Sequence, residues 1–384
     1  MTVTSSVQWR MGIQTRSSSF KGMSLTVTPP AHSPFSTQVP RSLLFVAPFW
    51  YCCPAMHRVK VAVVGAGVVG LSTAVVIAEA LPHCSVTVLA DRFTPNTTSD
   101  GAAGILFASQ FPDVPVEQQR RWFKRTFDHL LLIASSPEAG VAGVFLSSGW
   151  QIFREVPPEK KPYWSDCVLS FGTMTDAELK RFPQYKFGQA FTTIKCECPS
   201  YLPWLQKRLE KAGGIMIHEK VTDLAELGLR YDVIVNCSGL GSRELLGDED
   251  VHPVRGQVLR VHAPWLQHFV RVADGHTYIY PGAGGVTLGG TRQAADSQAI
   301  FERCRRLEPS LGSARPLGEW VGLRPGRRNP RVERGHVRVH GRRVPVVHNY
   351  GHGGWGITLS WGTALDALDL VRQCLNERPP EARL

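Results

Sequence analysis

Residues 59–91 decide the fold, and they read VKVAVVGAGVVGLSTAVVIAEALPHCSVTVLAD. The β-branched apolar run Val59–Val64 predicts a buried strand, and the glycine turn Gly65–Gly70 follows it and opens an apolar segment of helical character. A second apolar strand over Ser85–Ala90 ends in Asp91, 21 residues beyond the last glycine of the turn. Glycines let a pyrophosphate approach the backbone at the helix start, and the acidic residue accepts hydrogen bonds from ribose hydroxyls. The order strand, glycine turn, helix, strand and acid predicts a dinucleotide-binding β-α-β unit.

This unit alone is compatible with NAD or FAD, and two later glycine motifs discriminate between them. Tyr231–Asn236 predicts a further strand of the same sheet, and it runs into the turn 238–241, which reads Ser-Gly-Leu-Gly. Near the C-terminus, the glycine-rich segment Gly351–Gly356 precedes an apolar helix predicted over about 357–375. A nucleotide site that begins with the first strand and is completed by the last helix suits a long ligand that crosses the sheet. We therefore expect FAD.

Composition and charge exclude several other classes of protein. The chain has 384 residues, of which 43% are apolar and 20% charged, and it contains no apolar run of about 18 residues that could span a membrane. The net charge of +11 is spread out, and its densest part, 303–343, interleaves arginines with Gly, Pro and Val rather than with aromatic residues. This pattern favours a solvent-exposed basic surface that contains one functional arginine, rather than a groove that binds nucleic acid. We expect no membrane and no nucleic-acid partner.

The nine cysteines are an odd number and include no Cys-x-x-Cys pair. This spacing predicts neither a zinc site nor a disulfide framework, and no other metal site is indicated. Reduced thiols in an intracellular compartment are the expectation.

The remaining pattern predicts an α/β fold in which a Rossmann-like FAD-binding domain is interleaved with a mostly antiparallel β-sheet substrate-binding domain. Residues 1–55 are rich in Ser, Thr and Pro and hold four cations but no acid, which is typical of an unstructured extension; a transit peptide or an upstream start before Met56 are alternatives. The FAD-binding domain is assigned to 56–140, 195–249 and 316–384. Short alternating strands assign 141–194 and 250–315 to the substrate domain.

From Met56 to the C-terminus, the chain resembles the D-amino-acid oxidase family of FAD enzymes. The matching segments are Val63–Thr73, Arg92–Pro95, Thr97–Asp100, Phe182–Tyr185, Pro253–Val258, Val321–Pro325 and Asn349–Gly354. The resemblance implies oxidation of a D-amino acid by hydride transfer to flavin N5, with oxygen as the final acceptor. The products are then the 2-oxo acid, ammonia and hydrogen peroxide.

The resemblance also assigns residues to the substrate. Arg324 matches the arginine that grips the α-carboxylate, for which a planar guanidinium fork is suited, and Tyr278 matches a tyrosine whose hydroxyl helps to hold the same group. Arg271, in the short segment before Tyr278, and Arg292 imply a partner for a side-chain carboxylate, so that acidic D-amino acids such as D-aspartate are the expected substrates. Gly354 completes the substrate site.

Eighteen residues are assigned to the cofactor, from the fingerprint, the later glycine motifs and the resemblance. They are Gly65, Gly67, Val68, Val69, Gly70, Asp91, Arg92, Thr98, Ser99, Gly104, Ile105, Val221, Ser238, Gly353, Gly354, Gly356, Ile357 and Thr358.

Three other functions stay open at this point: an oxidase of neutral D-amino acids, an NAD-dependent dehydrogenase, and a flavin-binding protein that has lost turnover. The chain departs from the family at 107–110, which reads Phe-Ala-Ser-Gln, and it is several residues shorter between Gln293 and Cys304. His276 and His352 are candidates for general acid-base catalysis, but hydride transfer from a substrate with a neutral amine requires neither of them.

The chain ends in Ala382-Arg383-Leu384, a conservative variant of the Ser-Lys-Leu peroxisomal signal. The preceding Pro379-Pro380 pair would separate this tripeptide from the last helix. We expect it to bind the peroxisomal import receptor and to direct the protein to the peroxisomal matrix, with the cytosol as the alternative.

Overall fold

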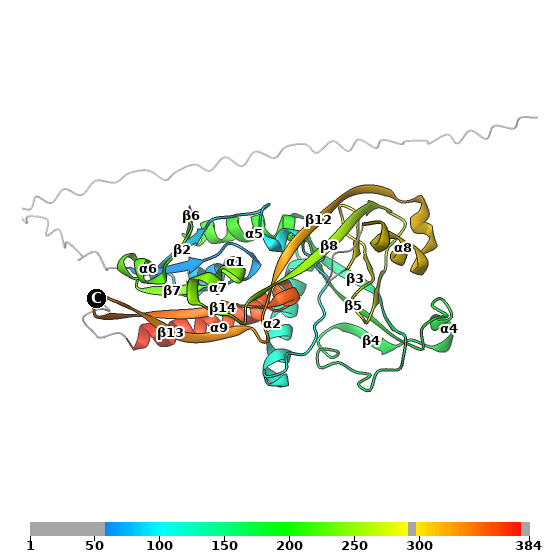
Figure 1. Ribbon diagram of the computed structural model, residues 1–384, viewed down its shortest axis with the longest axis horizontal. Helices are drawn as coiled ribbons and strands as arrows, with labels where there is room; N and C mark the ends of the chain where they lie inside the picture. The colour runs from blue at the N-terminus through cyan, green and yellow to red at the C-terminus, as the bar shows by residue number, and fades with distance from the viewer. Residues whose placement is uncertain (1–57, 291–296, 378–384) are drawn as a thin grey trace, which may run out of the picture. The chain divides into compact units, whose positions relative to one another are not determined.

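The β-α-β unit forms where the sequence indicates it in the computed structural model, which describes residues 58–290 and 297–377 (Figure 1). Strand β1 spans Val59–Val64, helix α1 Val68–Ala80 and strand β2 Cys84–Ala90. The two strands pair in parallel, with Val61 opposite Val86. The predicted extension 1–55 and the C-terminal tripeptide lie outside the described residues.

These strands belong to a six-stranded sheet with the order β13-β14-β7-β1-β2-β6. Its strands pair in parallel except for β13 and β14, which form an antiparallel hairpin. The further strands are β6 (Ile215–His218), β7 (Val233–Asn236), β13 (Arg331–Val339) and β14 (Arg342–Tyr350).

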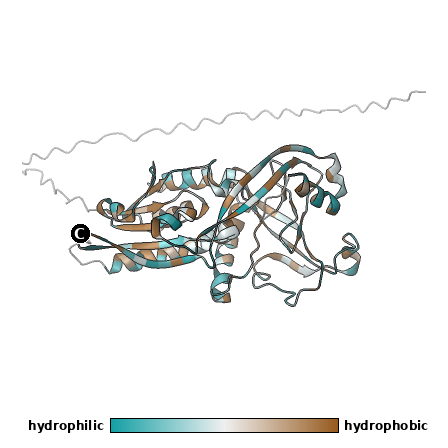
Figure 2. Cartoon of the chain, in the orientation of Figure 1, coloured by the Kyte–Doolittle hydropathy of each residue, from teal (hydrophilic) through white to brown (hydrophobic). Residues whose placement is uncertain are grey.

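Both faces of the central strands of this sheet are buried, as expected for a mostly parallel sheet. Val61 and Val63 of β1 belong to the larger core, which also takes in residues of α1, α5 (Cys198–Lys211) and α9 (Gly356–Asn376). Ala62 and Val64 point the opposite way and pack with α6 (Leu224–Arg230) and β14. Figure 2 shows the resulting concentration of hydrophobic residues along the strands.

The second sheet has eight strands in the order β12-β8-β11-β10-β9-β3-β5-β4, and all pairs are antiparallel except β3 with β9. The strands are β3 (Val144–Phe153), β4 (Leu169–Thr173), β5 (Phe187–Cys196), β8 (His252–His262), β9 (Phe269–Val272), β10 (Tyr278–Tyr280), β11 (Val286–Gly289) and β12 (Arg315–Gly326). This is the mostly antiparallel sheet that the sequence predicts.

The remaining helices are α2 (Val116–Ala134), α3 (Ala139–Ala142), α4 (Asp176–Leu179), α7 (Ser242–Leu246) and α8 (Ser297–Leu307). In the part of the chain that the structure describes, no helix has the length and apolar character needed to span a membrane.

One domain boundary differs from the sequence assignment. The sequence places residues 316–326 in the FAD-binding domain, but they form most of β12, which pairs with β8 from Arg315 opposite His262 to Gly326 opposite His252. The chain therefore rejoins the six-stranded sheet only at β13. The sequence misplaces this boundary because β12 contains Gly and Pro and its apolar side chains are largely exposed, so it lacks the alternation of a half-buried strand.

Candidate active site

A cavity of about 1080 Å³ lies where the two sheets meet. It is lined by residues at the carboxyl ends of β1, β2, β7 and β14, and by residues of β9, β10 and β12 from the second sheet. Ligands of open α/β sheets bind at the carboxyl ends of the strands. This volume exceeds that of most small-ligand pockets and fits a dinucleotide together with a small substrate.

The first glycine turn forms one wall of the cavity and requires glycine at two of its positions. Gly65 has φ +110°, and a Cβ there would overlap the carbonyl oxygen of Cys237; a Cβ on Gly70 would overlap the carbonyl oxygen of Gly65. The first turn of α1 contains no acidic residue, which leaves the N-terminal end of the helix suitable for an anionic ligand. These features fit the pyrophosphate of FAD.

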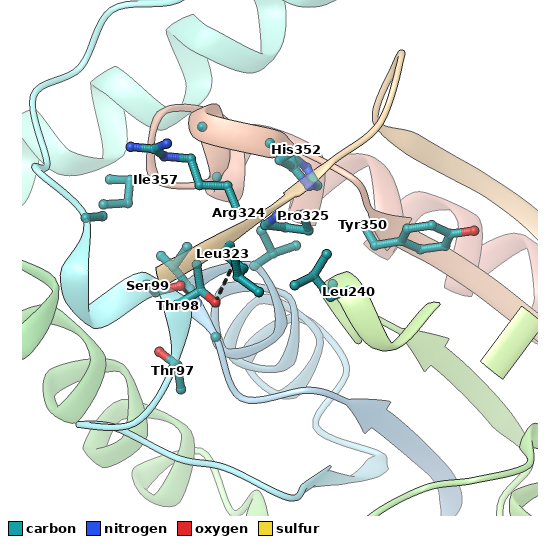
Figure 3. Close-up of a pocket in the computed structure, with 18 of the residues that line it drawn as sticks. Thr97, Thr98, Ser99, Leu240, Leu323, Arg324, Pro325, Tyr350, His352 and Ile357 are labelled. Carbon is teal, nitrogen blue, oxygen red and sulfur yellow. Dashed lines mark hydrogen bonds between the residues drawn. The ribbon is translucent and has the colours of Figure 1, made fainter. Parts of the chain in front are cut away.

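A short turn opposite α1 presents two hydroxyl side chains to the cavity (Figure 3). Asp100 is buried and accepts hydrogen bonds from Thr94 Oγ1 at 2.6 Å and from the Thr97 backbone N–H at 2.9 Å, which fixes the turn Thr98–Gly101. Ser99 Oγ then accepts a hydrogen bond from the Val68 backbone N–H at 3.0 Å.

The same turn is also joined to the second sheet. Thr98 Oγ1 donates a hydrogen bond to the Leu323 carbonyl of β12 at 3.1 Å.

All eighteen residues that the sequence assigns to the cofactor line this cavity. Asp91 stands at the end of β2 with about half of its side chain exposed, and its ion pair with Arg92 is loose at 3.8 Å. Its carboxylate is therefore available to a ribose. That each of these residues contacts FAD stays a prediction.

The substrate residues Arg271 and Tyr278 are neighbours because of strand register. Gln151 of β3 pairs with Arg271 of β9, and Arg271 pairs with Tyr278 of β10, so the three residues form a row across adjacent strands. Burial raises the pKa of Tyr278 to about 12, and the nearby guanidinium groups of Arg324 and Arg271 act in the opposite direction. The tyrosine hydroxyl is therefore protonated near neutral pH and can donate a hydrogen bond.

Arg324 reaches the same cavity from β12. Its guanidinium lies over Gly256 of β8, where a Cβ would overlap it, and its Nη1 donates to the Arg255 carbonyl at 3.2 Å. A Cβ on Gly354 would stand 3.6 Å from Arg324 Cδ, so the last glycine motif adjoins this arginine. The structure thus gathers Arg324, Arg271, Tyr278 and Gly354 around one cavity. Arg292 lies outside the described residues, as does part of the shortened segment after Gln293.

The two histidines differ in their surroundings. His276 is exposed and is not among the residues that line the cavity. His352 lines the cavity, is only 2% exposed, and lies with Nε2 3.1 Å from Thr363 Oγ1. Burial lowers the pKa of His352 to about 4, so its ring is neutral at neutral pH.

In the arginine-rich segment, a second arginine also reaches the cavity. Arg327 lines it, and its Nε donates to the buried Asp248 carboxylate at 3.0 Å. Unlike Arg324, it is therefore neutralised by the protein.

Sequence reasoning missed several residues of the substrate side. Phe107, Tyr280 and Trp355 line the cavity, and Gln151 contacts Arg271 directly, with its Oε1 2.7 Å from Arg271 Nη1. The departure of 107–110 from the family pattern was a signal for Phe107. No signal pointed to Gln151, because its position depends on the parallel pairing of β3 with β9, which links segments 120 residues apart.

Comparison with known proteins agrees with this geometry. A family model described as FAD dependent oxidoreductase matches residues 60–370. Human D-aspartate oxidase is 56% identical over 330 residues, which are 84% of this chain and 97% of that protein. D-amino-acid oxidase from Rubrobacter xylanophilus is 39% identical over 329 residues, 83% of this chain and 97% of that protein.

Among solved structures, glycine oxidase from Geobacillus kaustophilus is similar with a TM-score of 0.64. It is 21% identical and covers 82% of this chain and 95% of its own, so this likeness concerns the fold alone. The family model and the two oxidase relatives lead to one conclusion. The chain belongs to the family of FAD-dependent oxidoreductases that includes the D-amino-acid oxidases.

Proposed function

We propose that this protein oxidises D-aspartate and related acidic D-amino acids, with oxygen as the electron acceptor. The observation that carries the proposal is that two cationic side chains, Arg324 and Arg271, line the same cavity and both lie near Tyr278. Within residues 58–290 and 297–377, neither arginine forms an ion pair with a carboxylate of the protein. A substrate with two carboxylates would satisfy both cations.

The names of the relatives support the same choice. The 56% identical human protein is a D-aspartate oxidase, and a 37% identical relative from Caenorhabditis elegans is D-aspartate oxidase 1. An oxidase of neutral D-amino acids needs only the α-carboxylate anchor, and a second partly buried cation would then stay unpaired, which is costly.

The side chains would bind and orient the substrate as follows. The planar fork of Arg324 grips both oxygens of the α-carboxylate, and the protonated hydroxyl of Tyr278 donates to the same group. Arg271 pairs with the side-chain carboxylate. Three fixed points hold the α-carbon in one orientation, which is the main contribution that a positioning site makes to the rate.

The chemistry that FAD supplies when bound is acceptance of two electrons from the substrate and their return to oxygen, which becomes hydrogen peroxide. The α-amine must reach the site as a free base, and water then hydrolyses the imino acid to the 2-oxo acid and ammonia. The overall balance is D-aspartate, oxygen and water in, and oxaloacetate, ammonia and hydrogen peroxide out.

Replacing the side-chain cation tests the proposal. Arg271→Ala should lower kcat/KM for D-aspartate by an amount equivalent to about 2–5 kcal/mol if the ion pair between Arg271 and the substrate is desolvated. The loss of kcat/KM for D-alanine should be far smaller. Steady-state kinetics with both substrates measure this difference. Equal losses for the two substrates would show that Arg271 does not recognise the side chain.

We also propose that the protein is imported into the peroxisomal matrix through Ala382–Leu384. A peroxide-producing oxidase belongs beside catalase, and the tripeptide has the small, basic and leucine pattern of the import signal. Deleting the tripeptide from a chain with a free C-terminus should leave the protein in the cytosol, as seen by microscopy. Mitochondrial import that depends on residues 1–55, with no effect of the deletion, would contradict this address.

A further inference from the structure

Arg271 contacts two neutral side chains, while the carboxylate of Asp274, which also lines the cavity, acts on it at longer range without an ion pair. Gln151, only 9% exposed, lies opposite Arg271 in the β3–β9 pair and accepts a hydrogen bond from Arg271 Nη1 at 2.7 Å. The ring of Phe107, 8% exposed, lies beneath the guanidinium, with the Arg271 Cζ 4.0 Å from the ring centroid. An amide oxygen and a π face both stabilise a cation without cancelling its charge.

Phe107 is itself fixed by aromatic neighbours. Its ring meets the Trp355 ring edge-on, with centroids 5.4 Å apart and an interplanar angle of 77°. The Phe107 ring also packs against the Tyr280 ring, with the two ring centroids 6.4 Å apart. Since Trp355 belongs to the last glycine motif, the surface beneath Arg271 is continuous with the cofactor loop.

The lack of an ion-pair partner for Arg271 among the described residues has a consequence for the choice of substrate. A protein carboxylate beside Arg271 would hold the guanidinium equally well but would neutralise it, and an acidic substrate would then gain nothing from it. The Gln151 amide and the Phe107 ring orient the Arg271 guanidinium without forming an ion pair with it. The guanidinium can therefore still pair with a carboxylate of the substrate.

We infer that Phe107 and Gln151 are specificity-determining positioning residues, which orient Arg271 as an unneutralised cation for the side-chain carboxylate of the substrate. This inference rests on the proposed function. Both residues act through Arg271, so we expect their effect on selection between acidic and neutral substrates.

Exchanging the π face tests the role of Phe107. In the FAD-loaded enzyme, Phe107→Leu keeps an apolar side chain but removes the ring, whereas the matched variant Phe107→Tyr keeps the ring. We expect Phe107→Leu to lower kcat/KM for D-aspartate about 2- to 30-fold more than it lowers kcat/KM for D-alanine. Phe107→Tyr should restore most of the selectivity.

Changing the charge at position 151 tests the role of neutrality. Gln151→Glu would place a carboxylate against Arg271, and we expect the preference for D-aspartate over D-alanine in kcat/KM to fall at least about tenfold. Gln151→Met, which removes the hydrogen bond but adds no charge, should reduce the preference less. Titration of the oxidised flavoprotein with succinate and with butyrate reads out the same selection without turnover, through perturbation of the flavin spectrum.

The outcomes separate this inference from the proposed function. A wild-type enzyme that prefers D-aspartate, together with Phe107→Leu and Gln151→Glu variants that keep that preference, would overturn the inference and leave the proposed function standing. A folded wild-type flavoprotein with no preference for D-aspartate would overturn both. Loss of selectivity in Phe107→Leu and Gln151→Glu, with recovery in Phe107→Tyr, would support the inference.

Discussion

At the scale of single residues, the cavity is defined as much by missing side chains as by charged ones. The guanidinium of Arg324 occupies the space that a side chain at Gly256 would fill, and the ring of Tyr278 occupies the corresponding space at Gly289. The two groups that would hold the α-carboxylate are therefore positioned by glycines on the neighbouring strands. A larger residue at either glycine would displace a binding group without removing it.

This leads to a prediction that tests the anchor without changing it. Gly256→Ala should force the Arg324 guanidinium to move and lower kcat/KM for D-aspartate about 100-fold, the loss typical of an ångström-scale misplacement. Gly172→Ala in β4 is the matched control, because a Cβ there meets no atom within 4 Å. The flavin spectrum should be unchanged in both variants, since neither glycine lines the cavity.

Arg324→Ala gives the limiting case of the same prediction. It should nearly abolish turnover while FAD stays bound, because it removes the carboxylate clamp but no group assigned to the cofactor. Turnover assays and flavin content check this together. An active Arg324→Ala enzyme with ordinary affinity for D-aspartate would contradict the assignment of the anchor.

At the scale of elements, the sequence predicts best where pattern and burial coincide. Strand β1 has the predicted bounds Val59–Val64, and helix α9 spans Gly356–Asn376 against a prediction of about 357–375, because both are apolar segments beside glycine turns. The sequence places residues 316–326 in the FAD-binding domain, whereas β12 pairs within the eight-stranded sheet, because its exposed apolar residues give no periodic signal. Arg324 and Arg271 were identified through family resemblance, whereas Gln151 depends on a strand pairing that local sequence does not encode.

The packing of α2 against α9 makes a prediction about pH. His129 of α2 stacks on Trp361 of α9, with ring centroids 3.5 Å apart, and its Nε2 lies 3.2 Å from the Tyr201 hydroxyl. Burial, and secondarily the charge of Arg208, lowers the pKa of His129 from 6.5 to about 3. Because the unfolded chain takes up this proton first, the stabilising contribution is complete above pH 6.5 and is lost as the pH falls towards about 3.

His129→Phe keeps the stacking ring but cannot be protonated. Between pH 7 and pH 5, its free energy of unfolding should fall about 2 kcal/mol less than that of the wild type. Denaturant unfolding at the two pH values measures this difference. Burial also lowers the pKa of His348 and of His352 to about 4, so part of the acid sensitivity should remain in the variant. Identical pH dependence in variant and wild type would show that His129 is not held neutral by its surroundings.

At the scale of the whole molecule, function depends on two sheets that share one cavity. The six-stranded sheet supplies the glycine turns and Asp91 for the cofactor, and the eight-stranded sheet supplies Arg271, Tyr278 and Arg324 for the substrate. In Figure 1, β8 and β12 run from the eight-stranded sheet towards the six-stranded one, and Arg324 lies near the end of β12. The cofactor and the α-carbon of the substrate would thus be held by separate but adjoining layers.

Reduction of the bound flavin in the absence of oxygen tests the central claim most directly. D-Aspartate added anaerobically to the purified flavoprotein should bleach the oxidised-flavin absorbance completely, and readmission of oxygen should restore it with release of hydrogen peroxide. D-Alanine should bleach it much more slowly at the same concentration. A flavoprotein whose absorbance D-aspartate leaves unchanged, or which D-alanine reduces equally fast, would contradict the account of two unneutralised cations that select an acidic D-amino acid.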